Sequence, residues 1–442
     1  MDLESLRGRR VALLGAGTDV TALIPHLVGV EPAVVVAFDD AAYRLSDAAA
    51  TVLADAGIEV RETERLASDE LGFDVAVRSP GFNRYRHELD ALRANSLMTT
   101  PVDLWFGTHG KSHVVTIVTG TKGKSTTTTA LAALLADLDP IVMGNIGVPP
   151  WSIATEAAQS SRPVICELSS FQASDTSYVA DLAVLTSLGI DHVDWHGTVE
   201  RYHDDKLGPV RRARAAIGCA GDAAVAAALG EFGGIAVDVA SITADRSDAL
   251  AAFFATLPAH IASNFALAVA AAERIGAALL ADDVIIETLG AVDALPGRQR
   301  SLGTSGGVEA VDNALASNPL ASAAGLDSYP GRHVWMIVGG ADRGVPLDPL
   351  VEALGRRSPG SVTLVGIPHS GPALCAALGS HPAVRRTMDA ESIVDAVAML
   401  DPIGDDDVLL FSPTAPTPPE QGTWVDRSAA FVAAVEQRSR QA

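Results

Sequence analysis

The chain has 442 residues, of which 48% are hydrophobic and 19% charged, a balance typical of folded globular proteins and not of disordered chains. Its 54 acidic residues outnumber the 32 Lys and Arg, and the net charge of −22 argues against nucleic acid or an anionic membrane as a partner. Because this length exceeds what one hydrophobic core supports, we predict three domains, over residues 1–108, 109–297 and 298–442.

Three cysteines stand far apart in apolar surroundings, at Cys166, Cys219 and Cys375. Since this spacing gives neither a disulfide framework nor a zinc site, we interpret them as buried thiols in a reducing compartment. The N-terminal segment lacks an apolar signal core, and no run reaches the ~18 apolar residues of a membrane span. We therefore expect a cytoplasmic, monomeric protein that binds neither membranes nor nucleic acid.

The first hundred residues alternate short apolar runs with helical ones. The apolar runs are typical of buried strands and lie at 11–17, 33–40 and 75–82. Strand, glycine turn, helix and strand in this order predict a Rossmann-like parallel sheet. Val20 stands where the dinucleotide fingerprint has its third glycine after Gly15 and Gly17, so a redox dinucleotide site is only a minor alternative.

Two further α/β units follow. In the second unit, a strand at 113–120 runs into a glycine loop and an amphipathic helix, and other elements are expected at 163–168, 182–189 and 260–276. Pro296 and Gly297 then indicate a hinge over 294–300. The third unit ends in a helix after Trp424, and its strands are predicted at 307–313, 333–340, 361–366 and 407–413.

The clearest chemical motif is the glycine loop after the strand at 113–120. Its residues are Gly120, Thr121, Lys122, Gly123, Lys124, Ser125 and Thr126. Glycines let successive N–H groups converge on phosphate oxygens, and the helix N-terminus adds partial positive charge. Lys124 can reach the β- and γ-phosphates of ATP, and the Ser125 hydroxyl can bind Mg²⁺. Because Val118 stands where a full Walker A motif has glycine, the sequence predicts a P-loop-type site with a shortened motif.

Several motifs follow one another in a recognisable order: GTKGKST, then GNIGVPP, ELSSFQ, DHVDWHG and a C-terminal FSP. Over nearly the whole chain this order resembles the Mur ligases and their folylpolyglutamate synthetase relatives, and most of all the glutamate-adding Mur ligases. The resemblance implies an N-terminal domain for a nucleotide-linked substrate, a central ATPase domain and a Rossmann-like C-terminal domain. It also implies a reaction of peptidoglycan precursor synthesis, in which ATP phosphorylates the carboxylate of UDP-N-acetylmuramoyl-L-alanine and the amine of glutamate attacks the acyl phosphate.

Besides Ser125, three residues are expected to surround magnesium, and the resemblance implies two magnesium ions. Glu167 follows a strand and offers the hard oxygen ligand that Mg²⁺ prefers. By the resemblance, His192 is a second metal ligand or a substrate contact, and Lys206 is carbamylated to become an anionic ligand. His192, His196 and His203 could also suggest zinc, but phosphoryl transfer calls for Mg²⁺ and no thiolate lies nearby in the sequence.

The resemblance also covers residues expected beside the adenine and the γ-phosphate of ATP. Asn264 matches a segment beside the adenine, although Ile261 replaces the first asparagine of that segment. Arg298 matches a hinge arginine that reaches the γ-phosphate, and Asp312 matches the aspartate that follows it. Together with Lys124, His192 and Lys206, Arg298 completes the predicted catalytic set.

By the resemblance, the muramoyl nucleotide is expected to bind at two glycine turns, and their backbone N–H donors suit a diphosphate in so acidic a chain. The residues that resemble this site are Gly15, Gly17, Thr18, Asp39, Ser79, Gly81, Asn145 and His192.

The amino-acid pocket departs from the usual pattern of the glutamate-adding ligases. Ser317, Arg343 and Ser412 occupy the positions that would receive the carboxylates of glutamate, and two lysines of the usual motifs are replaced. A guanidinium is a planar fork and an ammonium a point charge, so the Arg for Lys change alters the site. These departures favour the branch that adds L-glutamate and leaves inversion to a separate epimerase, with addition of D-glutamate as the alternative.

Two other functions stay open. A folylpolyglutamate-synthetase-like or cyanophycin-type ligase would keep the ATPase, but GNIGVPP and the N-terminal domain speak against it. A non-catalytic nucleotide-binding regulator would keep the fold without the chemistry, and the joint presence of Lys124, Ser125, Glu167, His192 and Lys206 argues against that.

Overall fold

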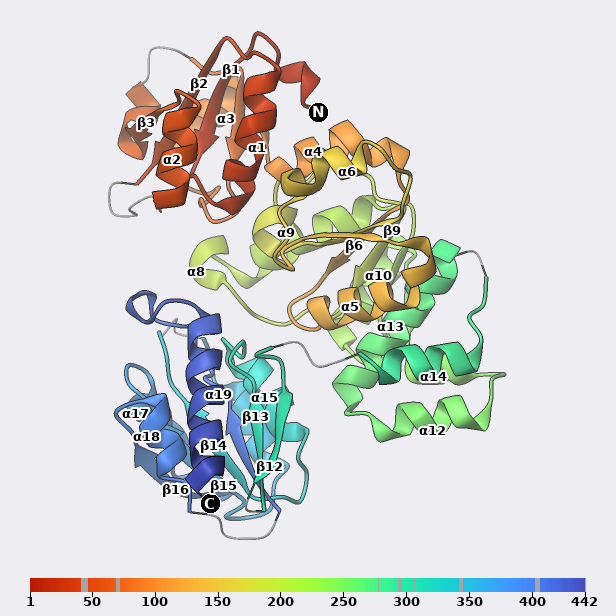
Figure 1. Cartoon of the computed structure of the whole chain (residues 1–442), viewed down its shortest axis with the longest axis vertical. Helices are drawn as coiled ribbons and strands as arrows, with labels where there is room; N and C mark the ends of the chain where they lie inside the picture. Colours follow the sequence, from red (N-terminus) through yellow and green to blue (C-terminus); the bar gives the residue numbers. More distant parts are fainter. Residues whose placement is uncertain are drawn as a thin grey trace. The chain divides into compact units, whose positions relative to one another are not determined.

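The computed structural model describes residues 1–40, 47–68, 72–276, 278–292, 296–305, 307–341, 345–401 and 406–441 (Figure 1). It divides into two compact units. The first unit comprises Met1–Leu257 and Ile261–Gly290, and the second comprises Pro258–His260 and Ala291–Ala442. Within the described residues, two β-sheets belong to the first unit and one to the second.

The first sheet has parallel strands in the order β3-β2-β1-β4-β5. Their bounds are β1 (Arg10–Leu14), β2 (Val34–Asp39), β3 (Glu59–Glu62), β4 (Val75–Arg78) and β5 (Leu97–Thr99). The apolar run of β1 is buried on both faces, with Val11 and Leu13 on the side of helix α1 (Thr18–Gly29) and Ala12 on the other. The strand order reverses between β1 and β4, and such a switch point opens the crevice in which these sheets bind ligands.

The second sheet is also parallel, in the order β11-β10-β9-β6-β8-β7. Its strands are β6 (Val115–Thr119), β7 (Ile141–Gly144), β8 (Val164–Glu167), β9 (Leu182–Leu185), β10 (Ala216–Cys219) and β11 (Ile235–Val237). Helix α5 (Lys124–Leu134) follows β6 and packs against β6 and β8, while α9 (Val199–Arg212) packs against β6 and β9. One continuous core joins this sheet to the first through α1 and α4 (Pro101–His109), whose Trp105 is fully buried.

The third sheet lies in the second unit, in the order β12-β13-β17-β14-β15-β16, and β12 alone pairs antiparallel with its neighbour. Its strands are β12 (Arg300–Ser305), β13 (Val308–Asp312), β14 (Val334–Val338), β15 (Val362–Gly366), β16 (Val384–Asp389) and β17 (Asp407–Phe411). One face is covered by α15 (Pro319–Asp327), α16 (Asp348–Gly355) and α17 (Gly371–Leu378). The other face is covered by α18 (Ile393–Ala398) and α19 (Trp424–Gln441).

The predicted α/β class with parallel sheets is confirmed, and the long helix expected at 260–276 is α13 (Ala259–Gly276). All three cysteines are free and buried, as expected. No helix in the described part of the chain is long and apolar enough to cross a membrane. Residues 294 and 295 of the expected hinge lie outside the described residues, and the three domain boundaries stay predictions.

Candidate active site

The phosphate loop between β6 and α5 is shaped by two glycines that tolerate no side chain. A Cβ on Gly120 would lie 2.1 Å from the Thr186 hydroxyl oxygen, and one on Gly123 would lie 2.3 Å from Oδ1 of Asn264. Gly123 is left-handed, with φ +87°, and is the N-cap of α5. Since the first turn of a helix has N–H groups without intrahelical acceptors, this end of α5 presents donors to an anion.

Lys124 folds back over the phosphate loop. Its Nζ donates to the backbone carbonyl oxygens of Gly120 at 2.9 Å and Thr121 at 3.1 Å. The rest of the loop is held against the end of β9, because the N–H groups of Thr121 and Lys122 donate to the backbone oxygen and hydroxyl of Ser187. The ammonium therefore lies against the loop itself, and its contact with phosphate stays a prediction.

Glu167, the last residue of β8, is fully buried and faces the start of α5. Its Oε2 accepts from the Ser125 hydroxyl at 2.5 Å, and its Oε1 accepts from the Asn145 amide at 2.7 Å. A hydroxyl and a carboxylate at one point beside a phosphate loop form the hard oxygen set that Mg²⁺ prefers. The predicted pair Ser125 and Glu167 therefore fits magnesium, and Asn145 touches the same carboxylate.

Lys206 lies on α9 and is almost completely buried. Its Nζ donates to the Gly120 carbonyl oxygen at 2.9 Å and lies 4.9 Å from the Tyr202 ring centroid. Burial, together with the positive charge of nearby Lys124, lowers the pKa of Lys206 well below its ordinary value. The uncharged amine is thereby favoured next to the phosphate loop.

His192 has a left-handed backbone, with φ +49°, where the chain turns from the end of β9 into the short helix α8 (Val193–His196). Its ring packs edge-on against Phe171, and its Nε2 lies 3.7 Å from the Asp191 carboxylate. Asp191 also lies 3.4 Å from the Lys122 ammonium. Although burial opposes ionisation, the charges of Lys122 and His192 lower the pKa of Asp191.

The three histidines do not form a zinc site. Nδ1 of His196 is bonded to Asp205 and its Nε2 to the Ser170 hydroxyl, while Nε2 of His203 faces the Gly189 carbonyl oxygen. Among the described residues, no group of three or more His, Cys, Asp or Glu side chains could hold a metal ion. His196 and His203 therefore act in hydrogen-bond networks that fix α8 and α9.

A pocket of about 350 Å³ lies at the switch point of the first sheet. It brings together five of the residues predicted to bind the muramoyl nucleotide: Gly17, Thr18, Ser79, Gly81 and Asn145. Gly15 and Asp39 do not line the pocket but contact residues next to its lining. Gly15 has φ +77°, and a Cβ there would lie 3.1 Å from Ser79 Cβ. Asp39 accepts from the Ala16 N–H at 3.1 Å.

A second pocket, of about 380 Å³, lies at the carboxyl ends of strands in the third sheet. Ser317 lines this pocket, and so do Ser370 and Thr414. Ser412, by contrast, is fully buried, accepts from the Asn313 amide at 3.0 Å and donates to Ser322 at 2.9 Å. Arg343 lies outside the described residues.

Asp312 and Arg298 belong to the second unit as well. The Asp312 carboxylate is fully buried and accepts from the Gly297 N–H at 3.0 Å and the Ser428 hydroxyl at 2.5 Å. Arg298 follows Gly297 and is half-buried. Asp312 thus fixes the turn that carries Arg298.

Comparison with known proteins agrees with this geometry. Residues 118–249 match the family model of the Mur ligase middle domain. The chain is 33% identical to a UDP-N-acetylmuramoyl-L-alanine–L-glutamate ligase of Salinispora tropica, and the match covers 98% of this chain and 99% of that protein. The chain belongs to the Mur ligases. It is also 30% identical to a UDP-N-acetylmuramoylalanine–D-glutamate ligase of Nocardia farcinica, over 92% of this chain and 87% of that protein.

The fold of this Mur ligase is shared with a solved relative. The crystal structure of the MurF ligase from Thermotoga maritima in complex with ADP matches with a TM-score of 0.53 and 15% identity, over 99% of this chain and 97% of that one. At this identity the likeness shows the fold alone. The predicted family and its three-domain α/β fold are confirmed.

Lysine is rare in this Mur ligase, and this rarity is a feature of the sequence that could have indicated site residues but was not considered. The chain has four lysines among its 32 Lys and Arg, and Lys111 is the one outside the phosphate site. Lys124 and Lys206 both donate to the Gly120 carbonyl oxygen of the phosphate loop, and Lys122 of the same loop pairs with Asp191. The rarity of lysine in the sequence could therefore have indicated Lys206 as a site residue without any motif.

Other residues of the site were not expected from the sequence. Asp19, in the first turn of α1, lines the pocket at the switch point of the first sheet and accepts from the Gln172 amide at 2.9 Å, and burial raises its pKa. Thr414 lines the second pocket two residues beyond the predicted Ser412. Arg78, which is fully buried beside the first pocket, carried no motif of its own.

Proposed function

We propose that this Mur ligase joins L-glutamate to UDP-N-acetylmuramoyl-L-alanine at the expense of ATP, through an acyl phosphate. The observation that carries the proposal is the position of Asn145. Its side chain donates to Glu167 beside the phosphate loop, and it also lines the pocket at the switch point of the first sheet. A carboxylate substrate in that pocket would thus lie next to the residues that face the γ-phosphate.

The residues around the loop support phosphoryl transfer. Lys124 and the N–H groups at the start of α5 would neutralise and orient the β- and γ-phosphates. Ser125 and Glu167 would hold Mg²⁺, which supplies a positive charge against the transferring phosphoryl group. Asn145 would keep the Glu167 carboxylate turned toward that point, since it occupies Oε1 and leaves Oε2 to the Ser125 side.

The buried position of Lys206 supports carbamylation. An uncharged amine can attack CO₂ at carbon and lose one proton, which leaves a carbamate anion on Nζ. The carbamate nitrogen keeps one N–H, so its bond to the Gly120 carbonyl oxygen can persist. The new oxygens would provide a hard ligand for a second Mg²⁺ near His192, where an unmodified lysine could not bind a cation.

The second pocket supports an amino-acid site in the C-terminal part of the chain. Carboxyl ends of strands are where open α/β sheets bind ligands, and the pocket there offers the hydroxyls of Ser317, Ser370 and Thr414. We assign Arg343 one carboxylate of glutamate. Ser412, which was predicted to contact the other carboxylate, instead accepts from the Thr414 hydroxyl and supports the pocket wall behind it. Arg298 is proposed to reach the γ-phosphate, with Asp312 fixing its turn.

The choice of L-glutamate is supported by similarity. Identity to the L-glutamate ligase of Salinispora tropica is 33% over 98% of the chain, against 30% over 92% for the D-glutamate ligase of Nocardia farcinica. The second comparison keeps D-glutamate as the alternative substrate.

The test is incubation of purified protein with ATP, Mg²⁺ and UDP-N-acetylmuramoyl-L-alanine, with L- or D-glutamate offered separately. We expect ADP release and amide formation with L-glutamate and at least 100-fold less with D-glutamate. Efficient use of D-glutamate alone would assign the chain to the alternative substrate. ADP release with neither enantiomer would contradict the proposed ligation as a whole.

A further inference from the structure

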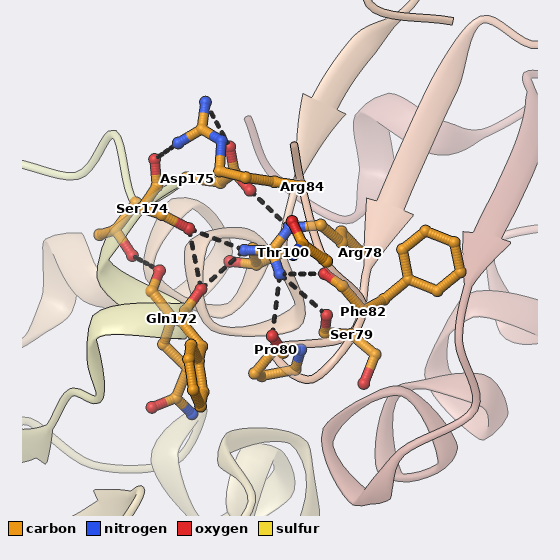
Figure 2. A network of polar contacts seen from close by, with 12 residues as sticks. Arg78, Ser79, Pro80, Phe82, Arg84, Thr100, Gln172, Ser174 and Asp175 are labelled. Atoms are coloured by element: carbon orange, nitrogen blue, oxygen red, sulfur yellow. Dashed lines mark hydrogen bonds and ion pairs between the residues drawn. The ribbon is translucent and has the colours of Figure 1, made fainter. Parts of the chain in front are cut away.

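Arg78 ends strand β4 and is fully buried, although it carries a charge. Its Nη1 donates to the backbone oxygens of Ser79 and Pro80, both at 3.0 Å, and of Phe82 at 2.8 Å (Figure 2). A single nitrogen therefore fixes three carbonyl groups of the turn that follows β4. This turn belongs to the first sheet.

The other edge of the same guanidinium contacts the segment around helix α7, which follows strand β8 of the second sheet. Nε donates to the Asp175 carboxylate at 2.6 Å, and Nη2 donates to the Phe171 backbone oxygen at 2.6 Å and the Ser174 hydroxyl at 2.9 Å (Figure 2). These acceptors lie in α7 (Ser170–Ala173) and directly after it, downstream of Glu167. All three nitrogens of Arg78 are thus hydrogen-bonded, and they connect the turn after β4 with α7 and the residues that follow it.

Both segments held by Arg78 are walls of the muramoyl pocket. Ser79 and Gly81 line it from the side of the first sheet, and Phe171 and Gln172 line it from the side of the second. Arg78 itself does not line the pocket, so its effect on a ligand is indirect. Its hydrogen bonds join the two walls.

The turn after β4 is held at further points of the same unit. Arg84 pairs with the other oxygen of Asp175 at 3.1 Å and also donates to the Ser174 carbonyl oxygen. The Tyr85 hydroxyl donates to Asp205 at 2.6 Å, and Asp205 precedes Lys206 on α9. The position of the turn is therefore tied to both α7 and α9.

We infer that Arg78 is a positioning residue for the muramoyl nucleotide, which holds the two walls of the pocket in register through its planar fork. The identity of the ligand rests on the proposed function. A lysine could not replace it, because one ammonium cannot reach acceptors on opposite edges of a guanidinium plane. Asp175 supplies the compensating charge that a buried cation requires.

The experiment compares Arg78→Lys, Arg78→Ala and Asp175→Asn with the wild-type full-length protein in the ligation assay. We expect the KM for UDP-N-acetylmuramoyl-L-alanine to rise at least tenfold in each variant, while the KM for ATP stays within twofold. Arg214→Lys is the control, because Arg214 is 73% exposed and makes a single ion pair with Asp181. A structural defect alone would lower the active fraction and change neither KM.

Chemical rescue adds a second measurement. Millimolar guanidinium should lower the raised KM of Arg78→Ala at least threefold, and methylammonium at the same concentration should not. Equal rises in the two KM values, or no rise in either, would overturn the positioning role. If Arg78→Ala does not fold, the KM ratio of Asp175→Asn decides. If the wild-type protein does not ligate, titration calorimetry with UDP-N-acetylmuramoyl-L-alanine still compares the variants, and the proposed reaction fails separately.

Discussion

The phosphate loop after β6 and the Gly339–Gly340 turn after β14 both begin with a glycine that directly follows a buried strand, but charged groups are arranged differently around them. At the phosphate loop every cation has a described acceptor close by, such as the Gly120 oxygen for Lys206 and Asp191 for Lys122. Behind the second turn lies Arg427, on α19, which is 2% exposed. No described carboxylate forms an ion pair with it.

Arg427 has few partners for a buried guanidinium. Its Nη2 donates to the Gly339 carbonyl oxygen at 2.6 Å, and the group lies over the Phe411 ring at 5.4 Å. Its Nε and Nη1 have no hydrogen-bond partner in the described structure. Burial alone lowers the pKa of Arg427 to about 10. Arg78, equally buried, has all three nitrogens bonded.

This difference in how charged groups are paired indicates how substitutions in each of the two regions should act. The phosphate site is a network whose members restrain one another, so the loss of one leaves an unpaired charge beside the others. The pocket of the third sheet consists mainly of apolar groups and hydroxyls brought together by several strand ends. We therefore expect substitutions in the first to act on catalysis and those in the second to act on one substrate.

The largest effect is expected for Lys124→Met. Loss of its charge from the β- and γ-phosphates should lower kcat by at least about 1,000-fold, which corresponds to about 4 kcal/mol of transition-state stabilisation. Ligation rate and circular dichroism of the variant measure activity and folding together. Lys111→Met is the control, because this exposed lysine lies outside the phosphate site and should leave the rate unchanged. Turnover near the wild-type value would remove Lys124 from the mechanism.

Lys206→Ala is expected to lower kcat by about 100-fold, since a Mg²⁺ ligand would be lost. Acetate or propionate should restore part of this activity, because a small carboxylate can occupy the cavity and supply the missing oxygens. Lys206→Arg should be equally impaired yet not respond, because its side chain fills the cavity. The rates with and without the added acids give the answer, and identical behaviour of the two variants would argue against a carbamate at this position.

A matched pair of glycine substitutions separates the two regions. Gly123→Ala places a Cβ 2.3 Å from Asn264 Oδ1 at a left-handed position, so the KM for ATP should rise about tenfold. Gly340→Ala places a Cβ 2.4 Å from the Pro416 backbone oxygen, beside the second pocket, so the KM for glutamate should rise instead. Steady-state assays with each substrate varied in turn test both. If Gly340→Ala raised the KM for ATP alone, the assignment of the second pocket would be wrong.

The strands and the helix that carry the phosphate loop could be predicted from the sequence because the residues of the candidate site are contiguous or directly follow strands. One predicted strand and one predicted helix are enough to place the loop from Gly120 to Thr126, and the end of a neighbouring strand is enough to place Glu167. Parallel pairing of β6 with β8 then brings the two together without further information.

Other parts depended on packing that a pattern in the sequence does not encode. Arg78 reads as an ordinary charge at a strand end, and only the approach of α7 explains its burial. Ser412 follows a strand as predicted, but its hydroxyl turns toward Asn313 and Ser322, which leaves the pocket wall to Thr414. For the pocket of the third sheet, the sequence thus predicted the location at the strand ends but not the contacts of the individual side chains.

The smallest effect is expected when Arg427 is replaced by Met. The substitution leaves one described acceptor, the Gly339 carbonyl oxygen, without its donor, and it removes a buried charge that has no counter-ion. These two effects oppose each other, so the free energy of unfolding should change by no more than about 1 kcal/mol in either direction.

In Arg78→Met the carboxylate of Asp175 would lose its closer partner, at 2.6 Å, and breaking such a buried pair costs about 3–5 kcal/mol. Arg84 still faces Asp175, so the lower end of that range is expected. Differential scanning calorimetry of the two variants beside the wild type measures the contrast, with the apparent unfolding midpoint falling for Arg78→Met alone. A comparable fall for Arg427→Met would mean that its guanidinium has a counter-charge within the fold, and the contrast between the two regions would then not hold.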